Sequence, residues 1–266
     1  MSTVEAGYDP TFLGPRVPLP VPAQTVRTLP STHFTVLLDP ERRLAAATAV
    51  NIDGAQLLDL ERGDDWHLDP RVPADEQAGP ELYARNDLDR GHLVRRRDPV
   101  WGDLVTARRA NLDTFAYPNA APQASAFNQG ELLWVGLEDH VLEYARTNDS
   151  RLSVFTGPVL ADDDPVYRGV GIPRLFWKVA AWAGPDLRAT AFVLDQTPFV
   201  TSLRAAADEV PPLGPFRTFQ VPVADVEDLT GLDLGPLTGA DVLAPVGARG
   251  DRERWVPLDT LEEIRL

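Results

Sequence analysis

The sequence predicts an α+β fold, in which a mixed, mainly antiparallel sheet packs against an amphipathic helix. Two apolar segments on either side of the turn-like residues 39–42 indicate a β-hairpin over residues 33–38 and 44–52. Apolar side chains then recur at spacings of 3, 4 and 3, the period of a helix, at Trp134, Leu137, Val141 and Tyr144. Runs of β-branched and aromatic residues bounded by glycine and proline are typical of strands and lie at residues 152–155, 175–182 and 189–194.

The chain before the hairpin carries six prolines, at positions 10, 15, 18, 20, 22 and 30. We therefore expect residues 1–30 to form an extended arm, either disordered or strapped onto the body or onto a partner subunit. Residues 31–266 then form one domain. Within it, the polar, proline-rich residues 61–80 predict a loop, and residues 88–94 and 114–117 predict short strands.

Composition excludes several classes of protein. The 266 residues include 25 Lys+Arg, 40 Asp+Glu and no cysteine, and the net charge is −15. The missing cysteines exclude disulfides and thiolate metal sites, and the negative charge argues against a protein that coats nucleic acid non-specifically. The first ten residues lack the parts of an export signal, and no apolar run approaches the roughly 18–20 residues that span a bilayer. We therefore expect a cytoplasmic protein with no membrane partner.

The positive charge is concentrated in one segment. Residues 85–109 contain seven arginines and four aspartates, a local balance of +3, so the remaining residues sum to −18. Arginine is suited to phosphate because its guanidinium presents a rigid fork of donors. The abundance of Ala, Gly, Pro, Asp and Arg also fits GC-rich coding DNA, which explains the number of arginines without explaining where they lie.

Only four histidines are candidates for neutral-pH proton transfer. We expect His33, His67 and His140 to be packing or surface residues. His92 differs because it lies in the run Asp89-Arg90-Gly91-His92, which joins an acid, a phosphate-binding fork, a glycine that admits close approach and a base. The signatures of several other enzyme classes, including GxSxG, HExxH and GxxxxGK[ST], are absent from the sequence.

Four blocks follow one another along the chain: Asp89-Arg90-Gly91-His92, Asn119-Ala120-Ala121-Pro122-Gln123, Asn128-Gln129-Gly130 and Trp134-Val135-Gly136-Leu137-Glu138. Their order and content resemble the signature of the DNA/RNA non-specific endonucleases. The similarity extends to residues 48–54, 155–158 and 172–178, and covers roughly residues 31 to 235. It implies a ββα-metal (His-Me finger) core, in which a hairpin presents the histidine and the next helix presents a metal-binding asparagine.

The resemblance implies a role for each matching residue. His92 is the general base and Asn128 the Mg²⁺ ligand, with Mn²⁺ as a substitute. Glu138 holds metal-bound water, and Asp89 orients the histidine or that water. The remaining predicted site residues are Arg90 and the more loosely matched Arg62 as phosphate contacts, and Arg95, Arg96 and Asn119 on the substrate side, where Asn119 is expected to support the site from a loop. A neutral imidazole accepts a proton from water near pH 7, and Mg²⁺ tolerates a single protein ligand because it keeps several waters.

Each residue also has a simpler interpretation. Asn128 suits a helix cap, Glu138 an exposed helix carboxylate, and residues 95–97 a solvated charged run. Two positions depart from the family pattern: Leu142 stands where an arginine is common, with Arg146 as a replacement, and Pro118 stands where Thr or Ser is common. These departures bear on rate and substrate preference.

The leading functional prediction is a metal-dependent endonuclease that cuts DNA and RNA without strong sequence specificity and leaves 5′-phosphate ends, as the resemblance implies. The alternative is a catalytically weak relative that binds nucleic acid or protein, and a third is an enzyme for short oligonucleotides or nucleotides. Because such a cytosolic nuclease endangers its host, we expect an inhibitor or an activating partner. The N-terminal arm is compatible with a homodimer.

Overall fold

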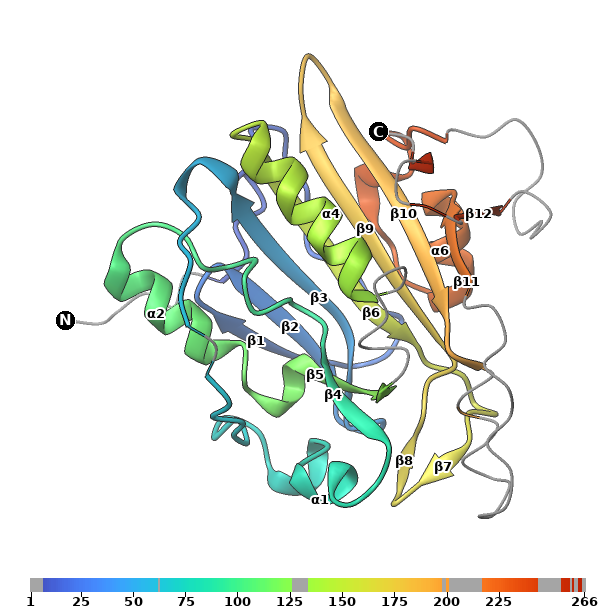
Figure 1. The fold of residues 1–266 in the computed structure, drawn as a ribbon. Helices are drawn as coiled ribbons and strands as arrows, with labels where there is room; N and C mark the ends of the chain where they lie inside the picture. Colours follow the sequence, from blue (N-terminus) through green and yellow to red (C-terminus); the bar gives the residue numbers. More distant parts are fainter. Residues whose placement is uncertain are drawn as a thin grey trace.

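The computed structural model describes residues 7–61, 63–125, 134–197, 200, 217–243, 255–258, 260 and 263–264. Within them, an antiparallel eight-stranded sheet forms the centre of the molecule (Figure 1), in the order β1-β2-β3-β6-β9-β10-β11-β12. The strands are β1 (Arg27–Ser31), β2 (Phe34–Asp39), β3 (Leu44–Asp53), β6 (Arg151–Val159), β9 (Leu175–Ala183), β10 (Leu187–Asp195), β11 (Arg217–Val221) and β12 (Val256–Pro257). The predicted α+β class is confirmed.

The predicted hairpin is β2–β3, which pairs Phe34 with Val50 in antiparallel register. Every residue of both strands is buried, because both faces of the sheet are covered, and this explains why the sequence shows continuous apolar runs there in place of alternation. His33 lies just outside the strand in a turn, with φ of 67°.

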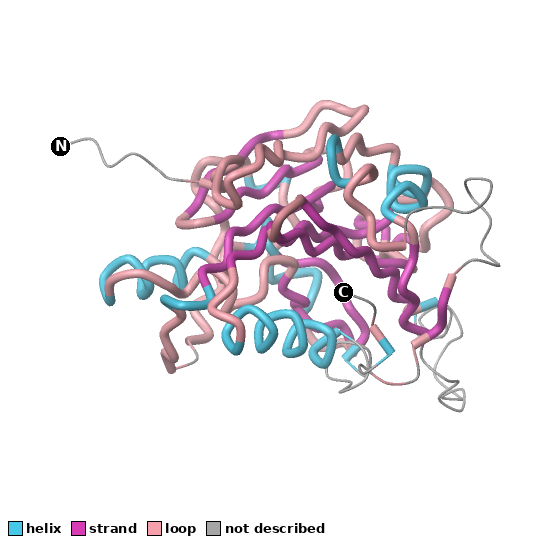
Figure 2. The backbone as a smooth tube through the Cα atoms, turned by 90° about the horizontal axis from the view of Figure 1, so that it is seen from above, coloured by secondary structure: helices cyan, strands magenta, loops and turns pink. Residues whose placement is uncertain are grey.

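Two layers cover the sheet, one on each face (Figure 2). One face packs against the predicted helix, α4 (Trp134–Thr147), whose Leu137 and Leu142 join a core with Val50 and Phe192. The same core includes residues beside and within the two-stranded ribbon of β4 (Leu88–His92) and β5 (Ala120–Ala124). The other face packs against the N-terminal segment and α6 (Val223–Thr230).

The N-terminal segment is strapped onto the body from residue 7 onward. Tyr8 N donates to Thr35 Oγ1 at 3.0 Å, and Tyr8 is buried. Val21 N donates to the Asp233 carbonyl at 3.0 Å. The first strand, β1, begins at Arg27, inside the predicted arm, and accommodates Pro30 because it is an edge strand of the sheet.

The predicted strand at residues 114–117 is wrong. The 3-10 helix η3 (Tyr117–Asn119) occupies its end, and the strand that pairs with β4 is β5, three residues further on. Local preference for aromatic and β-branched residues favoured 114–117, whereas β5 has the sequence AAPQA and is held in place by its tertiary contacts.

The remaining elements lie in the connections. Sequence patterns do not predict the helices α1 (Pro80–Tyr83) and α2 (Leu104–Asp113), or the small ribbon of β7 (Val166–Tyr167) and β8 (Val170–Gly171). Single 3-10 turns are η1 (Gly54–Gln56), η2 (Ala74–Glu76) and η4 (Gly235–Leu237). The predicted loop at 61–80 contains η2 and ends where α1 begins.

Candidate active site

The DRGH residues lie on β4, and the register of the β4–β5 ribbon decides how they project. Asp89 pairs with Gln123 and His92 with Ala120. Because side chains alternate along a strand, Arg90 and His92 project from one face and Asp89 from the other. Gly91 is required by close packing: a Cβ there would lie 2.1 Å from Cδ of the buried Gln123.

His92 is half-buried at the end of β4, between two aromatic rings. The imidazole centroid lies 4.6 Å from the Trp66 ring at an interplanar angle of 48°, and 5.2 Å from the Phe115 ring, edge to face. Trp66 also contacts Phe115 and Tyr117. These contacts restrict the tilt of the imidazole, whose Nε2 atom is buried although the residue as a whole is partly exposed.

Arg90 shares the Trp66 ring with His92. Its guanidinium carbon lies 5.3 Å from the Trp66 centroid, a cation–π distance, and its Nη2 lies 3.7 Å from Asp64 Oδ1. The Arg90 side chain is 37% exposed, so it is accessible to a phosphate. The imidazole of His92 and the guanidinium of Arg90 thus lie beside one tryptophan. We call Trp66, Arg90, His92 and Phe115 the aromatic wall.

Asn119 braces the chain just after His92. Its Oδ1 accepts from Val94 N at 2.9 Å, and its Nδ2 donates to the carbonyls of Val94 and Thr114 at 3.0 Å each. The side chain is fully buried. A substrate contact by Asn119 would require these bonds to break, so the geometry favours the supporting role over a direct contact.

Asp89 lies on the opposite face of the ribbon from His92. Its Oδ1 accepts from Ser125 Oγ at 2.9 Å. This placement directs the carboxylate towards the connection that follows β5, so it does not reach His92 directly along the strand.

Glu138 is buried on α4, where two cations hold its carboxylate. Lys178 Nζ lies 3.5 Å from Oε1, and Arg95 Nε lies 3.6 Å from Oε2. Asp98 is a second buried acid, and its negative charge acts on the Glu138 carboxylate. We call Arg95, Asp98, Glu138 and Lys178 the ion cluster. The simpler interpretation of Glu138 as an exposed helix carboxylate is wrong, because only 6% of the residue is exposed.

Burial shifts the protonation of both acids. It raises the pKa of Glu138 to about 7, while Lys178 and Arg95 pull that pKa down and Asp98 pushes it up. Burial likewise raises the pKa of Asp98 to about 6, against the opposing effect of Lys178, Arg95 and Arg97. Desolvation is therefore the dominant cause of both raised pKa values, and the neighbouring cations limit the rise.

The neighbouring arginines are held by the protein itself. Arg95 also pairs with Asp139, and Arg97 Nη2 pairs with Asp59 at 2.7 Å. Arg96 Nη1 donates to the Leu60 carbonyl and to Asn111 Oδ1, each at 3.0 Å. The run at 95–97 is therefore not simply a solvated charged stretch.

At the position where the family often has an arginine, this chain has a residue of the hydrophobic core. Leu142 is buried against the sheet, so its side chain is directed away from solvent. Arg146, one turn further on, is 46% exposed and lies 3.2 Å from Asp59. Arg146 is thus accessible, with an acid beside it.

Two predicted site residues, Arg62 and Asn128, lie outside the described residues. Within the described part of the chain, no three His, Cys, Asp or Glu side chains come together as metal ligands. The predicted metal site needs one amide oxygen from Asn128, and it stays a prediction. Glu138, predicted to hold metal-bound water, is described and buried, with both carboxylate oxygens beside cations of the protein.

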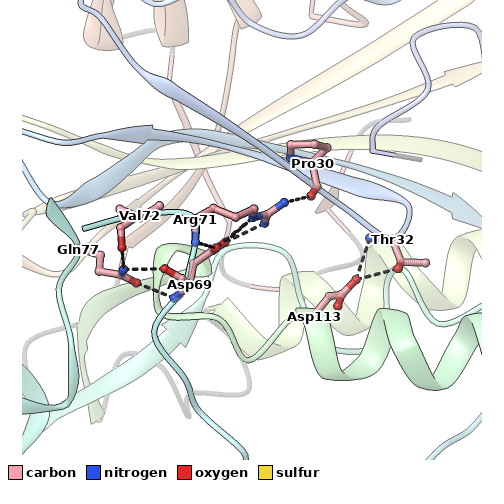
Figure 3. A network of polar contacts seen from close by, with 7 residues as sticks. All are labelled: Pro30, Thr32, Asp69, Arg71, Val72, Gln77 and Asp113. Atoms are coloured by element: carbon pink, nitrogen blue, oxygen red, sulfur yellow. Dashed lines mark hydrogen bonds and ion pairs between the residues drawn. The ribbon is translucent and has the colours of Figure 1, made fainter. Parts of the chain in front are cut away.

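A pocket of about 600 Å³ lies between α2 and the 67–71 segment. Figure 3 shows its polar network, in which Arg71 pairs with Asp69, and Asp113 accepts from the backbone and hydroxyl of Thr32. Its His67 follows Trp66 in an extended segment, so the two side chains project to opposite sides. The pocket is therefore separated from the aromatic wall by the backbone of that segment.

Sequence reasoning missed three residues of this region. Trp66, Lys178 and Asp98 have no role in the sequence-based prediction of the site. Lys178 carried a signal, because it is the only lysine in the chain and interrupts an apolar strand. Trp66 carried a weaker one, as an aromatic residue in a polar loop.

The antiparallel sheet, the β4–β5 ribbon and the helix bearing Glu138 define an α+β nuclease fold. The chain of the EndoG/EndoGI complex, whose structure describes EndoG inhibition, matches this fold with a TM-score of 0.58 and 21% identity, over 77% of this chain and 84% of that one.

The model of the DNA/RNA non-specific endonuclease family matches residues 16–241. The chain belongs to this family of hydrolases, which confirms the resemblance.

Three curated proteins are similar to the chain, and two of them are endonucleases. The chain is 41% identical to the uncharacterized protein y4fB of Sinorhizobium fredii over 85% of this chain, and 29% identical to mitochondrial endonuclease G of Bos taurus over 69%. It is 30% identical to the salivary endonuclease of Lutzomyia longipalpis over 47%. The matches span 38%, 58% and 31% of these relatives. Within the described residues, no helix is long and apolar enough to cross a membrane.

Proposed function

We propose that the protein is a metal-dependent endonuclease that hydrolyses phosphodiester bonds of DNA and RNA without strong sequence specificity. The observation that carries this proposal is the aromatic wall, where His92 and Arg90 project from one face of β4 beside Trp66. Family membership supports the same chemistry.

In the proposed reaction, His92 takes a proton from a water molecule while the oxygen of that water attacks phosphorus. The bond from phosphorus to the 3′ oxygen breaks, which leaves a 5′-phosphate on one fragment and, once the leaving oxygen takes up a proton, a 3′-hydroxyl on the other. Arg90 donates to non-bridging oxygens, whose charge grows in the transition state. Asn128 would hold Mg²⁺, or Mn²⁺ in its place, with Glu138 fixing the water around it. The bound metal would supply positive charge beside the leaving oxygen.

The decisive test is nicking of supercoiled plasmid at low salt with Mg²⁺, with EDTA, and with the variants His92→Ala and Asn128→Ala. We expect EDTA to abolish cleavage and each variant to reduce it by roughly 10³-fold. His67→Ala is the matched control, because His67 is an exposed histidine that projects away from the aromatic wall. Cleavage by His92→Ala at the wild-type rate would remove the assigned base.

A catalytically weak binding relative is the second candidate, and the buried Leu142, at a position where the family often has an arginine, favours it. A pure binder shifts the plasmid band without nicking it. Cleavage of a dinucleotide in preference to a long duplex would instead indicate the third candidate, a nuclease for short substrates.

We further propose that an inhibitor or an activating partner restrains the activity. The inhibition of EndoG described for the EndoG/EndoGI complex supports this for a protein of the same fold. Expression of wild type and His92→Ala in growing cells tests it: full nuclease activity in the cytoplasm without harm to growth would contradict restraint. The homodimer and the cytoplasmic location stay predictions.

A further inference from the structure

Lys178 is a buried cation on an apolar sheet face. It lies in β9 between Phe176 and Ala180, which project from the same face into the core under α4. Its side chain is 1% exposed. All 24 other cationic side chains of the Lys/Arg type are arginines. Burying an ammonium group costs free energy unless opposite charge and hydrogen bonds compensate it.

The contacts of Lys178 lead to Glu138. Its Nζ donates to Oγ1 of Thr156, its direct partner on β6, at 3.0 Å, and lies 3.5 Å from Glu138 Oε1. Arg95 approaches the other carboxylate oxygen at 3.6 Å. Each oxygen of Glu138 therefore faces a different cation, so rotation of the carboxylate would weaken both pairs.

The ion cluster joins three parts of the fold. Lys178 comes from the central sheet, Glu138 from α4, and Arg95 and Asp98 from the segment that follows His92. Two cations and two acids balance inside the cluster, and Asp139 pairs with the outer end of Arg95. The position of Glu138 relative to His92 is thus set through charged contacts as well as through apolar packing.

We propose that Lys178 is a positioning residue that holds the Glu138 carboxylate in one orientation, with Arg95 as the second cation. This rests on the proposed function, in which Glu138 acts as a carboxylate. Stability alone does not account for the arrangement, because a buried ion pair is often replaced by apolar residues of similar volume at no cost. Among the described residues, the charged groups that act on Glu138 are Lys178 from β9 and Arg95 and Asp98 from the 93–100 segment, and Asp139 pairs with Arg95.

The test compares Lys178→Met, Lys178→Arg, Glu138→Gln and the double variant Lys178→Met/Glu138→Gln. We expect Lys178→Met to lower kcat by about 30-fold with KM within about twofold, and to move the acidic limb of the pH–rate profile up by about one unit. Lys178→Arg should recover most of kcat. The double variant should be no slower than Glu138→Gln, because the two residues act as one unit. Arg188→Met is the control, since it removes one exposed cation of β10.

Thermal unfolding gives a readout independent of activity. Lys178→Met should lower Tm by roughly 6–12 °C at pH 8, and less at pH 5.5, where Glu138 is protonated. If Lys178→Met does not fold, Thr156→Val should show smaller shifts in the same direction, because it removes the hydroxyl that accepts from Lys178.

Two results would overturn the proposal. The first is a pH–rate profile that is unchanged in Lys178→Met. The second is a double variant whose loss of kcat equals the product of the losses in Lys178→Met and Glu138→Gln. An inactive wild-type protein would instead contradict the proposed function. In that case the Tm values still decide whether Lys178 holds this carboxylate, because Lys178→Met should then lower Tm by a different amount in the wild-type background and in the Glu138→Gln background.

Discussion

The aromatic wall and the ion cluster hold the two titratable groups of the candidate site in opposite ways. His92 is half-buried, and aromatic rings restrict its orientation. Glu138 is almost fully buried, and charges restrict it. Packing against rings restricts how a neutral imidazole can tilt, whereas a carboxylate that keeps its charge out of water needs compensating cations. The two regions lie only three residues apart at His92 and Arg95, so one short segment connects both environments.

The largest expected effect is the pH dependence of stability that the ion cluster creates. The pKa of Glu138 is raised to about 7 from 4.5, so the folded state binds its proton more tightly than the unfolded state. The stability that this tighter proton binding contributes is fully present below about pH 4.5 and is lost as the pH rises through about 7. Relative to Glu138→Gln, the wild-type protein should therefore lose roughly 3 kcal/mol of unfolding free energy between pH 4.5 and pH 8.

Urea unfolding of both proteins across this pH range measures the difference. Glu143→Gln, on the exposed side of the same helix, is the control and should track the wild type. A constant difference between wild type and Glu138→Gln would show that Glu138 titrates normally, and the contrast between the two regions would then disappear.

The second prediction concerns the aromatic wall. Trp66→Ala removes the ring that contacts both His92 and Arg90, so we expect kcat to fall about 100-fold, equivalent to about 2.7 kcal/mol in the barrier. Trp66→Phe should retain more activity because it keeps an aromatic face. Single-turnover cleavage of a labelled duplex measures the chemical step.

Trp101 provides a matched control for Trp66. Its ring stacks on His33 with centroids 3.4 Å apart, which makes it a second tryptophan–histidine pair, and His33 Nδ1 is hydrogen-bonded to the Pro99 carbonyl. Trp101→Ala should lower stability while activity per folded molecule stays close to wild type. Equal losses in both variants would mean that Trp66 has no special part in positioning.

The motif residues could be predicted from sequence because their chemistry is local. The DRGH run lies on β4, within the strand predicted at residues 88–94, and the 3.6 period places Glu138 on a helix. The strand β5 was misplaced because local preference favoured residues 114–117. The helix α2 was missed although Asp103 is a strong cap, whose side chain accepts from Val105 N and Thr106 N.

The ion cluster could not be predicted because it depends on strand register. Lys178 and Glu138 are 40 positions apart, and the contact exists only because β9 runs beneath α4 in one register. Shifting β9 by one residue would turn Lys178 to the opposite face of the sheet. No spacing rule within the sequence contains this information.

The third prediction distinguishes a brace from a substrate contact at Asn119. Asn119→Ala leaves the amide and carbonyl of Val94 and the carbonyl of Thr114 without their partner, so we expect a loss of about 2 kcal/mol in unfolding free energy. Activity should fall through kcat, because the segment after His92 is released, with KM little changed. Unchanged stability with a raised KM would instead identify Asn119 as a direct substrate contact.

The smallest expected effect concerns the electrostatics of binding. The net charge of −15 leaves binding dependent on a few cations, and the structure separates Arg90, which is accessible on the aromatic wall, from Arg96, whose guanidinium donates to Leu60 and Asn111. Arg90→Gln should reduce the steepness of log K against log salt by the amount that corresponds to about one phosphate contact. Arg96→Gln should leave that slope unchanged and should lower the free energy of unfolding by less than about 1 kcal/mol. Fluorescence anisotropy of a short duplex, measured in EDTA to prevent cleavage, gives both slopes. An equal loss in both variants would place the substrate across the 95–97 run as well, and would show that its internal hydrogen bonds yield to phosphate.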